Sequence, residues 1–188
     1  MLVVITETIE QGHRTAASLV AQSIKKHPAL RLGLAAGTTP IGVYQSLIDL
    51  HRSKRLDFSG VEFFSLDEFL GLHSSGSHSY HAFFHHHLFR HINANPGNIH
   101  LLAGEAQGDI DSYCHSYERL IHDRGGIDVQ LLGIGVNGHL AFNEPMSGFR
   151  SRPRVCFLGT ETRETLSRTF KETVVPEWAV PMGLGTIS

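Results

Sequence analysis

Residues 131–145 (Leu-Leu-Gly-Ile-Gly-Val-Asn-Gly-His-Leu-Ala-Phe-Asn-Glu-Pro) are the stretch of the chain where we most expect chemistry, because a turn with three glycines holds one histidine, two asparagines and one glutamate. An apolar, strand-like run at residues 127–134 leads into this glycine-rich turn. If the turn curls, Glu144 can hold one imidazole nitrogen of His139 and leave the other free to transfer protons. Asn137 can orient a neighbour but cannot act as an anion. The competing interpretation is structural, with His139 bonded to a backbone carbonyl in a tight loop.

The glycines of this stretch also match a nucleotide-binding pattern. Gly133, Gly135 and Gly138 spell G-x-G-x-x-G, which in dinucleotide-binding domains opens a helix near the first strand. Here the pattern comes late in the chain, and residues 143–145 (Asn-Glu-Pro) follow where helical turns should continue. We therefore disfavour a nucleotide site and interpret the stretch as a glycine loop that carries a histidine and a carboxylate.

A carboxyl pair follows another predicted strand, at residues 61–66. Ligands of open α/β sheets bind beyond the carboxyl ends of the strands, and Asp67 stands at such an end. Partial burial would raise its pKa toward the working pH and make it a general base. Glu68 competes for that role. The structural alternative is that Asp67 bonds the backbone of the following loop.

A third strand end carries a turn that suits an anion. Residues 37–40 (Gly-Thr-Thr-Pro) follow the predicted strand at residues 30–35 and offer backbone N–H groups, two hydroxyls and a helix N-terminus. The same turn can be purely structural, with Thr39 capping the next helix. Arg168, or with less support Arg163, would supply the bidentate charge that a phosphate favours.

Composition narrows the class of protein. With 188 residues, 41% of them hydrophobic, the chain can bury the core of one domain. The net charge of -2 gives no reason to expect nucleic acid or a membrane surface as a partner. Cys114 and Cys156 lack metal spacing and suit a reducing compartment. The N-terminus shows no signal-peptide pattern and no long apolar run occurs, so we expect a soluble, cytoplasmic protein that binds a small polar ligand.

Five histidines on one predicted helix include pairs at metal-chelating spacing: His81, His85, His86, His87 and His91. The apolar residues of that helix already define its buried stripe, so several of these histidines should lie in water. A signature of the H-E-x-x-H type is absent from the sequence. We therefore predict no metal site.

Strands and helices alternate along the sequence. Besides the strands above, we predict strands at residues 2–5, 98–102, 155–158 and 178–184, and helices around residues 16–24, 43–48, 80–92, 113–121 and 160–170. The loop at residues 71–79 is the most lid-like segment. This alternation favours a Rossmann-like α/β fold with a mostly parallel sheet and helices on both faces. Residues 183–188 look like the start of another unit, so we expect a fold truncated at its C-terminus.

The motifs resemble those of the glucosamine-6-phosphate deaminase (isomerase) family, in the same order and over nearly all of the chain. The matching segments are residues 37–40, 65–72 (Ser-Leu-Asp-Glu-Phe-Leu-Gly-Leu), 79–83 (Ser-Tyr-His-Ala-Phe), 133–145 and 162–170 (Thr-Arg-Glu-Thr-Leu-Ser-Arg-Thr-Phe). The resemblance implies conversion of glucosamine 6-phosphate and water to fructose 6-phosphate and ammonia, with no redox cofactor. It implies one sugar-phosphate isomerase-type domain over residues 1–188 that lacks the family's C-terminal strand and helix units, including a phosphate-binding lysine.

The resemblance also assigns roles. Asp67 matches the base that moves a proton between C2 and C1 of the opened sugar. His139 matches the histidine that helps to open the pyranose ring, with Glu144 and Asn137 in its relay. Some family members have Asp where this chain has Asn137, so Glu144 is expected to orient the imidazole more nearly alone. The matched phosphate contacts are Thr38, Thr39 and Arg168, and the Gly37 backbone shapes their loop.

Several alternatives stay open at this point. Galactosamine 6-phosphate differs at one hydroxyl, which motifs do not resolve. A sugar-phosphate-binding module without turnover would fit Asn137 and the missing C-terminal units. The 6-phosphogluconolactonases share the fold but lack a segment like residues 142–145 (Phe-Asn-Glu-Pro), which disfavours a lactonase. Hexameric family members make a homo-oligomer one allowed assembly. Their allosteric site is matched at Ser147 and Arg154 but not at Cys156 and Phe157, so we do not predict that regulation.

Overall fold

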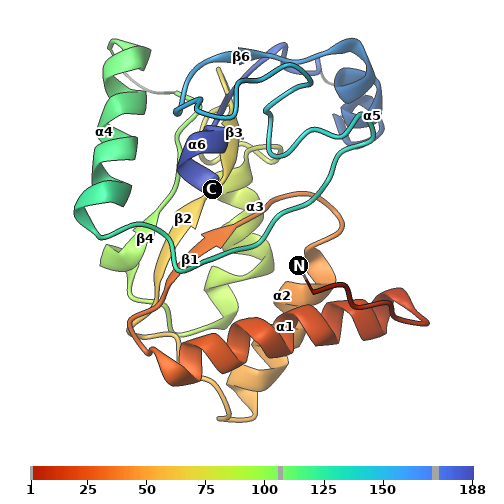
Figure 1. The fold of residues 1–188 in the computed structure, drawn as a ribbon, viewed down its shortest axis with the longest axis vertical. Helices are drawn as coiled ribbons and strands as arrows, with labels where there is room; N and C mark the ends of the chain where they lie inside the picture. Colours follow the sequence, from red (N-terminus) through yellow and green to blue (C-terminus); the bar gives the residue numbers. More distant parts are fainter. Residues whose placement is uncertain (1, 106–107, 171–173) are drawn as a thin grey trace.

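The computed structural model of the protein describes residues 2–105, 108–170 and 174–188. Its centre is a four-stranded parallel sheet in the order β4-β2-β1-β5 (Figure 1). The strands are β1 (Arg31–Leu34), β2 (Glu62–Ser65), β4 (Ile99–His100) and β5 (Val129–Gln130). Leu32 of β1 pairs with Phe63 on one side and with Val129 on the other. The prediction of an α/β fold built on a mostly parallel sheet is confirmed.

Helices cover both faces of this sheet. Successive residues of a strand point to opposite faces, and Phe63 and Phe64 of β2 accordingly lie in two different apolar clusters. Phe63 packs in the cluster that includes residues of α1 (Ile9–Lys26), α2 (Ile41–Arg52) and α3 (Tyr80–His87). Phe64 packs in the cluster that includes α4 (Ile110–Asp123). The short helices η1 (Phe89–His91) and η2 (Pro96–Asn98) connect α3 to β4.

Capping residues set where the helices begin and end. Thr8 caps α1, because its hydroxyl oxygen accepts a hydrogen bond from the Gln11 N–H at 3.2 Å. After α4, Gly125 and Gly126 have φ of 88° and 90°, the left-handed backbone conformation that commonly ends a helix. Their N–H groups donate to carbonyls of the last helical turn. None of the helices among the described residues is long and apolar enough to cross a membrane.

A second sheet, which the sequence did not predict, stands next to the first. It is antiparallel, in the order β3-β7-β6, and consists of β3 (Asp67–Phe69), β7 (Trp178–Pro181) and β6 (Cys156–Phe157). The helices α5 (Thr160–Phe170) and α6 (Leu184–Ile187) flank β7 in sequence. The chain passes from β2 through Leu66 directly into β3, where Asp67 pairs with Pro181. The strand at residues 61–66 therefore does not end in a loop, and Asp67 is buried.

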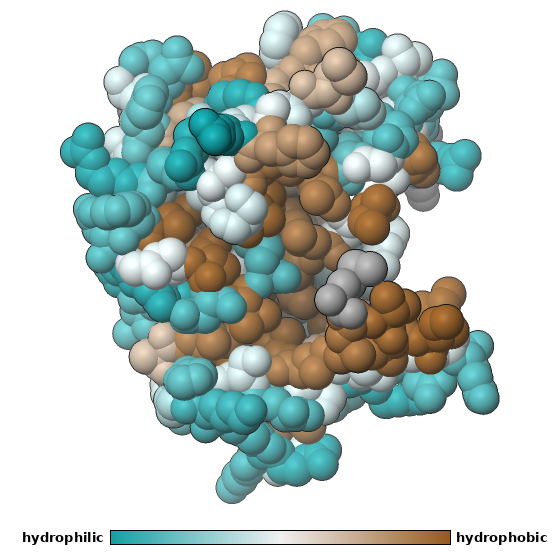
Figure 2. Space-filling model, viewed as in Figure 1, coloured by the Kyte–Doolittle hydropathy of each residue, from teal (hydrophilic) through white to brown (hydrophobic). Residues whose placement is uncertain are grey.

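Three expected elements differ in the structure. Residues 2–5 form no strand and are exposed, on a face where Figure 2 shows apolar side chains gathered around a hollow. Of the run at residues 127–134 only β5 is a strand, because the chain then turns into the glycine loop. The helix expected over residues 80–92 ends at His87, since Leu88 has φ of -139° and leaves the helical region.

Candidate active site

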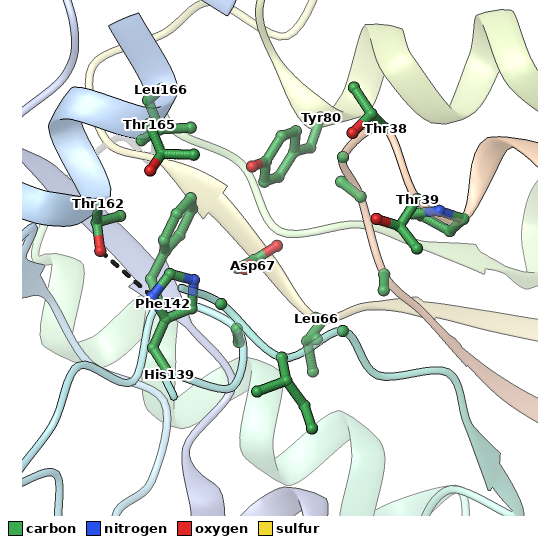
Figure 3. A pocket seen from close by; sticks show the side chains of 18 of the residues that line it. Thr38, Thr39, Leu66, Asp67, Tyr80, His139, Phe142, Thr162, Thr165 and Leu166 are labelled. Carbon is green, nitrogen blue, oxygen red and sulfur yellow. Dashed lines mark hydrogen bonds between the residues drawn. The ribbon is translucent and has the colours of Figure 1, made fainter. Parts of the chain in front are cut away.

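A cavity of about 280 Å³ opens beyond the carboxyl ends of the parallel strands. It is lined by Asp67, by His139 and by residues 37–39, so three of the predicted groups meet there. In Figure 3, Asp67 lies between His139 on one side and Thr38 and Thr39 on the other. Arg168 lies on an exposed face of α5 and does not line this cavity. Among the described residues, no group of three or more His, Cys, Asp or Glu side chains could hold a metal ion.

Asp67 has the environment of a general base. Its side chain belongs to the buried core and is 6% exposed, yet it lines the cavity. Burial, and then the nearby Glu68 carboxylate, raises the pKa of Asp67 from 3.8 to about 8. A carboxyl group with such a pKa can both take and return a proton near neutral pH. Glu68 points elsewhere and accepts hydrogen bonds from the backbone of α3, so it does not compete as the base.

Asn137 connects His139 to Glu144. The Asn137 Nδ2 donates to Glu144 Oε2 at 2.8 Å, which places the Asn137 Oδ1 toward His139. This oxygen accepts from the backbone N–H of His139 at 3.2 Å and lies 2.8 Å from His139 Nδ1. Because Oδ1 can only accept, Nδ1 carries the proton, and the free lone pair of the neutral imidazole is on Nε2. An uncharged amide thus fixes the tautomer of the histidine.

The expected direct orientation of His139 by Glu144 is corrected here, because Asn137 stands between the two side chains. The other carboxylate oxygen of Glu144 accepts from the Gly159 N–H at 3.1 Å. Burial alone would raise the pKa of Glu144, but hydrogen bonds from Thr162, Asn137 and Gly159 and the charge of His139 lower it overall. Glu144 is therefore held as an anion at the far end of the relay.

The backbone of the glycine loop brings the imidazole into the cavity wall. A Cβ on Gly135 would stand 2.2 Å from His139 Nε2, so only glycine allows this close approach. Asn143 is 3% exposed, and its Nδ2 donates to the carbonyls of Leu140 at 3.0 Å and Met182 at 2.8 Å. The loop is thereby fastened to the segment that follows β7.

The turn before α2 leaves the N-terminus of this helix available to a ligand. Gly37 has φ of 105°, in the region that favours glycine, and Thr38 and Thr39 are exposed. The expected cap by Thr39 is wrong, because Pro40 occupies the N-cap position and no side chain bonds the first N–H groups of α2. Both hydroxyls and the positive end of the helix dipole can therefore interact with an anion.

Three residues with no predicted role also shape the site. Tyr80 and Phe142 line the cavity, with their rings stacked at 5.9 Å between centroids. Thr162, which is 2% exposed, has its hydroxyl oxygen 3.3 Å from His139 Nδ1 (Figure 3). All three lie within the segments that carry the family resemblance, at residues 79–83, 133–145 and 162–170. No role was predicted for them, and they reach the cavity from separate elements.

Comparison with known proteins decides the family. The family described as glucosamine-6-phosphate isomerases/6-phosphogluconolactonase matches residues 5–170. The chain belongs to this glucosamine-6-phosphate isomerase/6-phosphogluconolactonase family. Among relatives in the family, the glucosamine-6-phosphate deaminase of Thermoanaerobacter sp. (strain X514) is 43% identical over 100% of this chain and 74% of its own length. Glucosamine-6-phosphate deaminase 2 of Bacillus subtilis (strain 168) is 42% identical, over 100% and 76%.

Solved structures of the glucosamine-6-phosphate isomerase/6-phosphogluconolactonase type agree with this placement. A structure described as a monomeric glucosamine-6-phosphate deaminase superposes with a TM-score of 0.95 at 40% identity, over 100% of this chain and 78% of the other. The 6-phosphogluconolactonase of Trypanosoma brucei gives a TM-score of 0.70 at 19% identity, over 98% and 76%. The second likeness concerns the fold alone.

The buried Asp67 should make stability depend on pH. The unfolded chain releases this proton near its ordinary pKa, whereas the folded protein keeps it up to about pH 8. The cost of burial is absent below the unfolded pKa and grows as pH rises through this window. We expect the free energy of unfolding in urea to fall from about pH 4 to about pH 8 by a few kcal/mol more in the wild type than in Asp67→Asn. Parallel pH profiles for the two proteins would contradict this prediction.

Proposed function

We propose that the protein catalyses aldose–ketose isomerisation and deamination of glucosamine 6-phosphate, giving fructose 6-phosphate and ammonia. The observation that carries this proposal is one cavity with a buried carboxyl group of raised pKa facing a histidine of fixed tautomer. The names of the 40–44% identical relatives support the same substrate. We place the reaction in the cytoplasm, with a small amino-sugar phosphate as the ligand.

His139 has the arrangement needed for ring opening. Its Nε2 lone pair can accept the proton of the anomeric hydroxyl and return a proton to the ring oxygen, so that the C1–O5 bond breaks and an open aldehyde forms. The imidazolium formed in between is stabilised through Asn137 by the Glu144 carboxylate. The relay supplies charge stabilisation without a direct ion pair.

Asp67 then moves the proton that isomerises the sugar. Its carboxylate removes the proton from C2 and delivers one to C1, while the amine loses a proton and O1 gains one, so the open amino aldose becomes a ketose-type imine with a hydroxyl at C1. Water adds to the imine carbon, and the C2–N bond breaks to release ammonia and leave the ketone. The raised pKa of Asp67 suits both directions of the transfer, because the acid form is also populated near neutral pH.

The phosphate is assigned to the turn at residues 37–39. Gly37 permits the turn, the Thr38 and Thr39 hydroxyls donate, and the uncapped N-terminus of α2 adds its dipole. None of the described residues that line the cavity is a lysine or arginine. Arg168 serves as the cation if the last turn of α5 moves toward the cavity when substrate binds.

The test is ammonia release from glucosamine 6-phosphate and from galactosamine 6-phosphate by the purified protein, together with acid release from 6-phosphogluconolactone. We expect turnover of the first and a lower kcat/KM for the second. A preference for galactosamine 6-phosphate would replace the substrate, and lactone hydrolysis would replace the reaction class. Tight binding in calorimetry without any product would favour a binding module instead.

A further inference from the structure

We propose that Glu68 is a positioning residue for this reaction, because its carboxylate fixes the first turn of α3 and so holds the Tyr80 ring against the cavity beside Asp67. The inference rests on the proposed function, and it adds a residue that the acid–base assignments leave unused. Glu68 is 1% exposed, directly follows Asp67 in β3 and makes no contact with the relay of His139.

The carboxylate completes the cap of α3. Glu68 Oε1 accepts from the Tyr80 N–H at 2.9 Å, and Oε2 accepts from the His81 N–H at 2.9 Å. The next N–H, of Ala82, donates to the Ser79 hydroxyl oxygen at 3.1 Å, so the side chains of Glu68 and Ser79 satisfy three successive donors. A buried anion at a helix N-terminus also interacts favourably with the helix dipole. The first turn of α3 is thus fastened to β3 rather than free to shift.

Tyr80 lies in the first turn of α3 and links its position to the wall of the cavity. Its ring lies 4.8 Å from the Phe69 ring of β3 and stacks on Phe142 of the glycine loop at an interplanar angle of 8°. The residue therefore touches both the strand that presents Asp67 and the loop that presents His139 (Figure 3). Displacement of α3 would open the wall between the two acid–base groups and admit water.

Glu68 also acts on Asp67 through its charge. The charge of Asp67 acts on Tyr80 of α3, Tyr44 of α2 and Tyr117 of α4, and His139 lines the same cavity. The three tyrosines are neutral because burial raises their pKa values further. Among the residues that the structure describes, Glu68 is the one anion whose charge contributes to the raised pKa of Asp67. A capping carboxylate that lies away from Asp67, such as Asp109 at the start of α4, would leave the titration of Asp67 unchanged.

Glu68→Gln tests both effects. Glu68 accepts from the N–H groups of Phe69, Tyr80 and His81. One amide oxygen cannot accept from all three of them, and the added NH2 group faces donors. We expect kcat/KM to fall about 10- to 100-fold, as for a displaced catalytic geometry. The acidic limb of the pH profile should move to lower pH, because loss of the anion lowers the pKa of Asp67. A folded Gln variant with an unchanged limb and a rate within about twofold of the wild type overturns the proposal.

Matched variants separate position from charge. Glu68→Asp keeps the negative charge but shortens the side chain. It should lower kcat/KM while the acidic limb of the pH–rate profile moves little. This variant replaces Glu68→Gln in the test if the Gln variant does not fold. Asp109→Asn removes a carboxylate that caps α4 and does not line the cavity, and it should cost stability while leaving the pH profile unchanged. Equal behaviour of the Asp109 and Glu68 variants would reduce Glu68 to a structural cap.

One further measurement is independent of turnover. The ¹³C NMR titration of the Asp67 carboxyl carbon should have its midpoint at lower pH in Glu68→Gln than in the wild type. If the wild type releases no ammonia, the proposed function fails, while the NMR midpoint still decides the inference about Glu68. An unchanged midpoint overturns the inference even if the enzyme deaminates its substrate.

Discussion

Asp67→Asn is expected to lower kcat for ammonia release from glucosamine 6-phosphate by about 10²- to 10⁴-fold. The amide has the shape of the carboxyl group but cannot accept the C2 proton. KM should change little, because the residue acts on carbon-bound hydrogen and not on the phosphate. The measurement is steady-state ammonia release, together with exchange of the C2 hydrogen with solvent deuterium, which should disappear in parallel.

The control for this variant is Asp123→Asn. Asp123 is an exposed carboxylate at the end of α4 and does not line the cavity, so the same replacement of Asp by Asn should leave kcat unchanged. Circular dichroism should show both variants folded. Persistent exchange at C2 in Asp67→Asn would assign the base to another group, whatever the rate of ammonia release.

The predicted groups lie close together because of a parallel-sheet topology that the sequence indicates. Strand signals at residues 30–35, 61–66 and 127–134 are strong because these segments are largely apolar and lie next to clear helical periodicity. Carboxyl ends of neighbouring parallel strands share one edge of a sheet, so Gly37, Asp67 and His139 had to approach one another. The pattern of strands and the rule that ligands bind beyond the carboxyl ends of parallel strands were sufficient to predict this part of the site.

The second sheet required information that local patterns do not carry. β3 pairs with β7, more than 100 residues later, and each strand has three or four residues, too few for a periodic signal. The consequence is functional, because this pairing buries Asp67 and raises its pKa. From the sequence alone, a raised pKa of Asp67 could be predicted only on the assumption that its side chain is partly buried.

The order of the relay depended on loop geometry. His139 and Glu144 were expected to meet directly, but Gly138 and Ala141 have φ of 87° and 54°, and these turns bring Asn137 between them. A positive φ at an alanine leaves no mark in the sequence. Arg168 illustrates the opposite case, because its residue type suits a phosphate while the structure places it on an exposed helix face.

His139→Gln is expected to lower kcat/KM with the pyranose substrate by about 10²- to 10³-fold, since glutamine cannot exchange the protons of ring opening. Asn137→Ala should produce a smaller loss, because it frees the imidazole to adopt the wrong tautomer and cuts its connection to Glu144. In the double variant, the Asn137 substitution should add almost nothing, since its effect passes through His139. Steady-state rates of the four proteins in the cycle measure this coupling.

Asn98→Ala provides the matched control for the relay, because Asn98 lies in η2 and outside the cavity. It should leave the rate unchanged in either background. If Asn137→Ala instead lowered the rate of His139→Gln as much as that of the wild type, Asn137 would act on substrate independently. The uncharged asparagine would then be a binding group, and the tautomer of His139 would have to be fixed by Thr162, whose hydroxyl lies 3.3 Å from the same nitrogen.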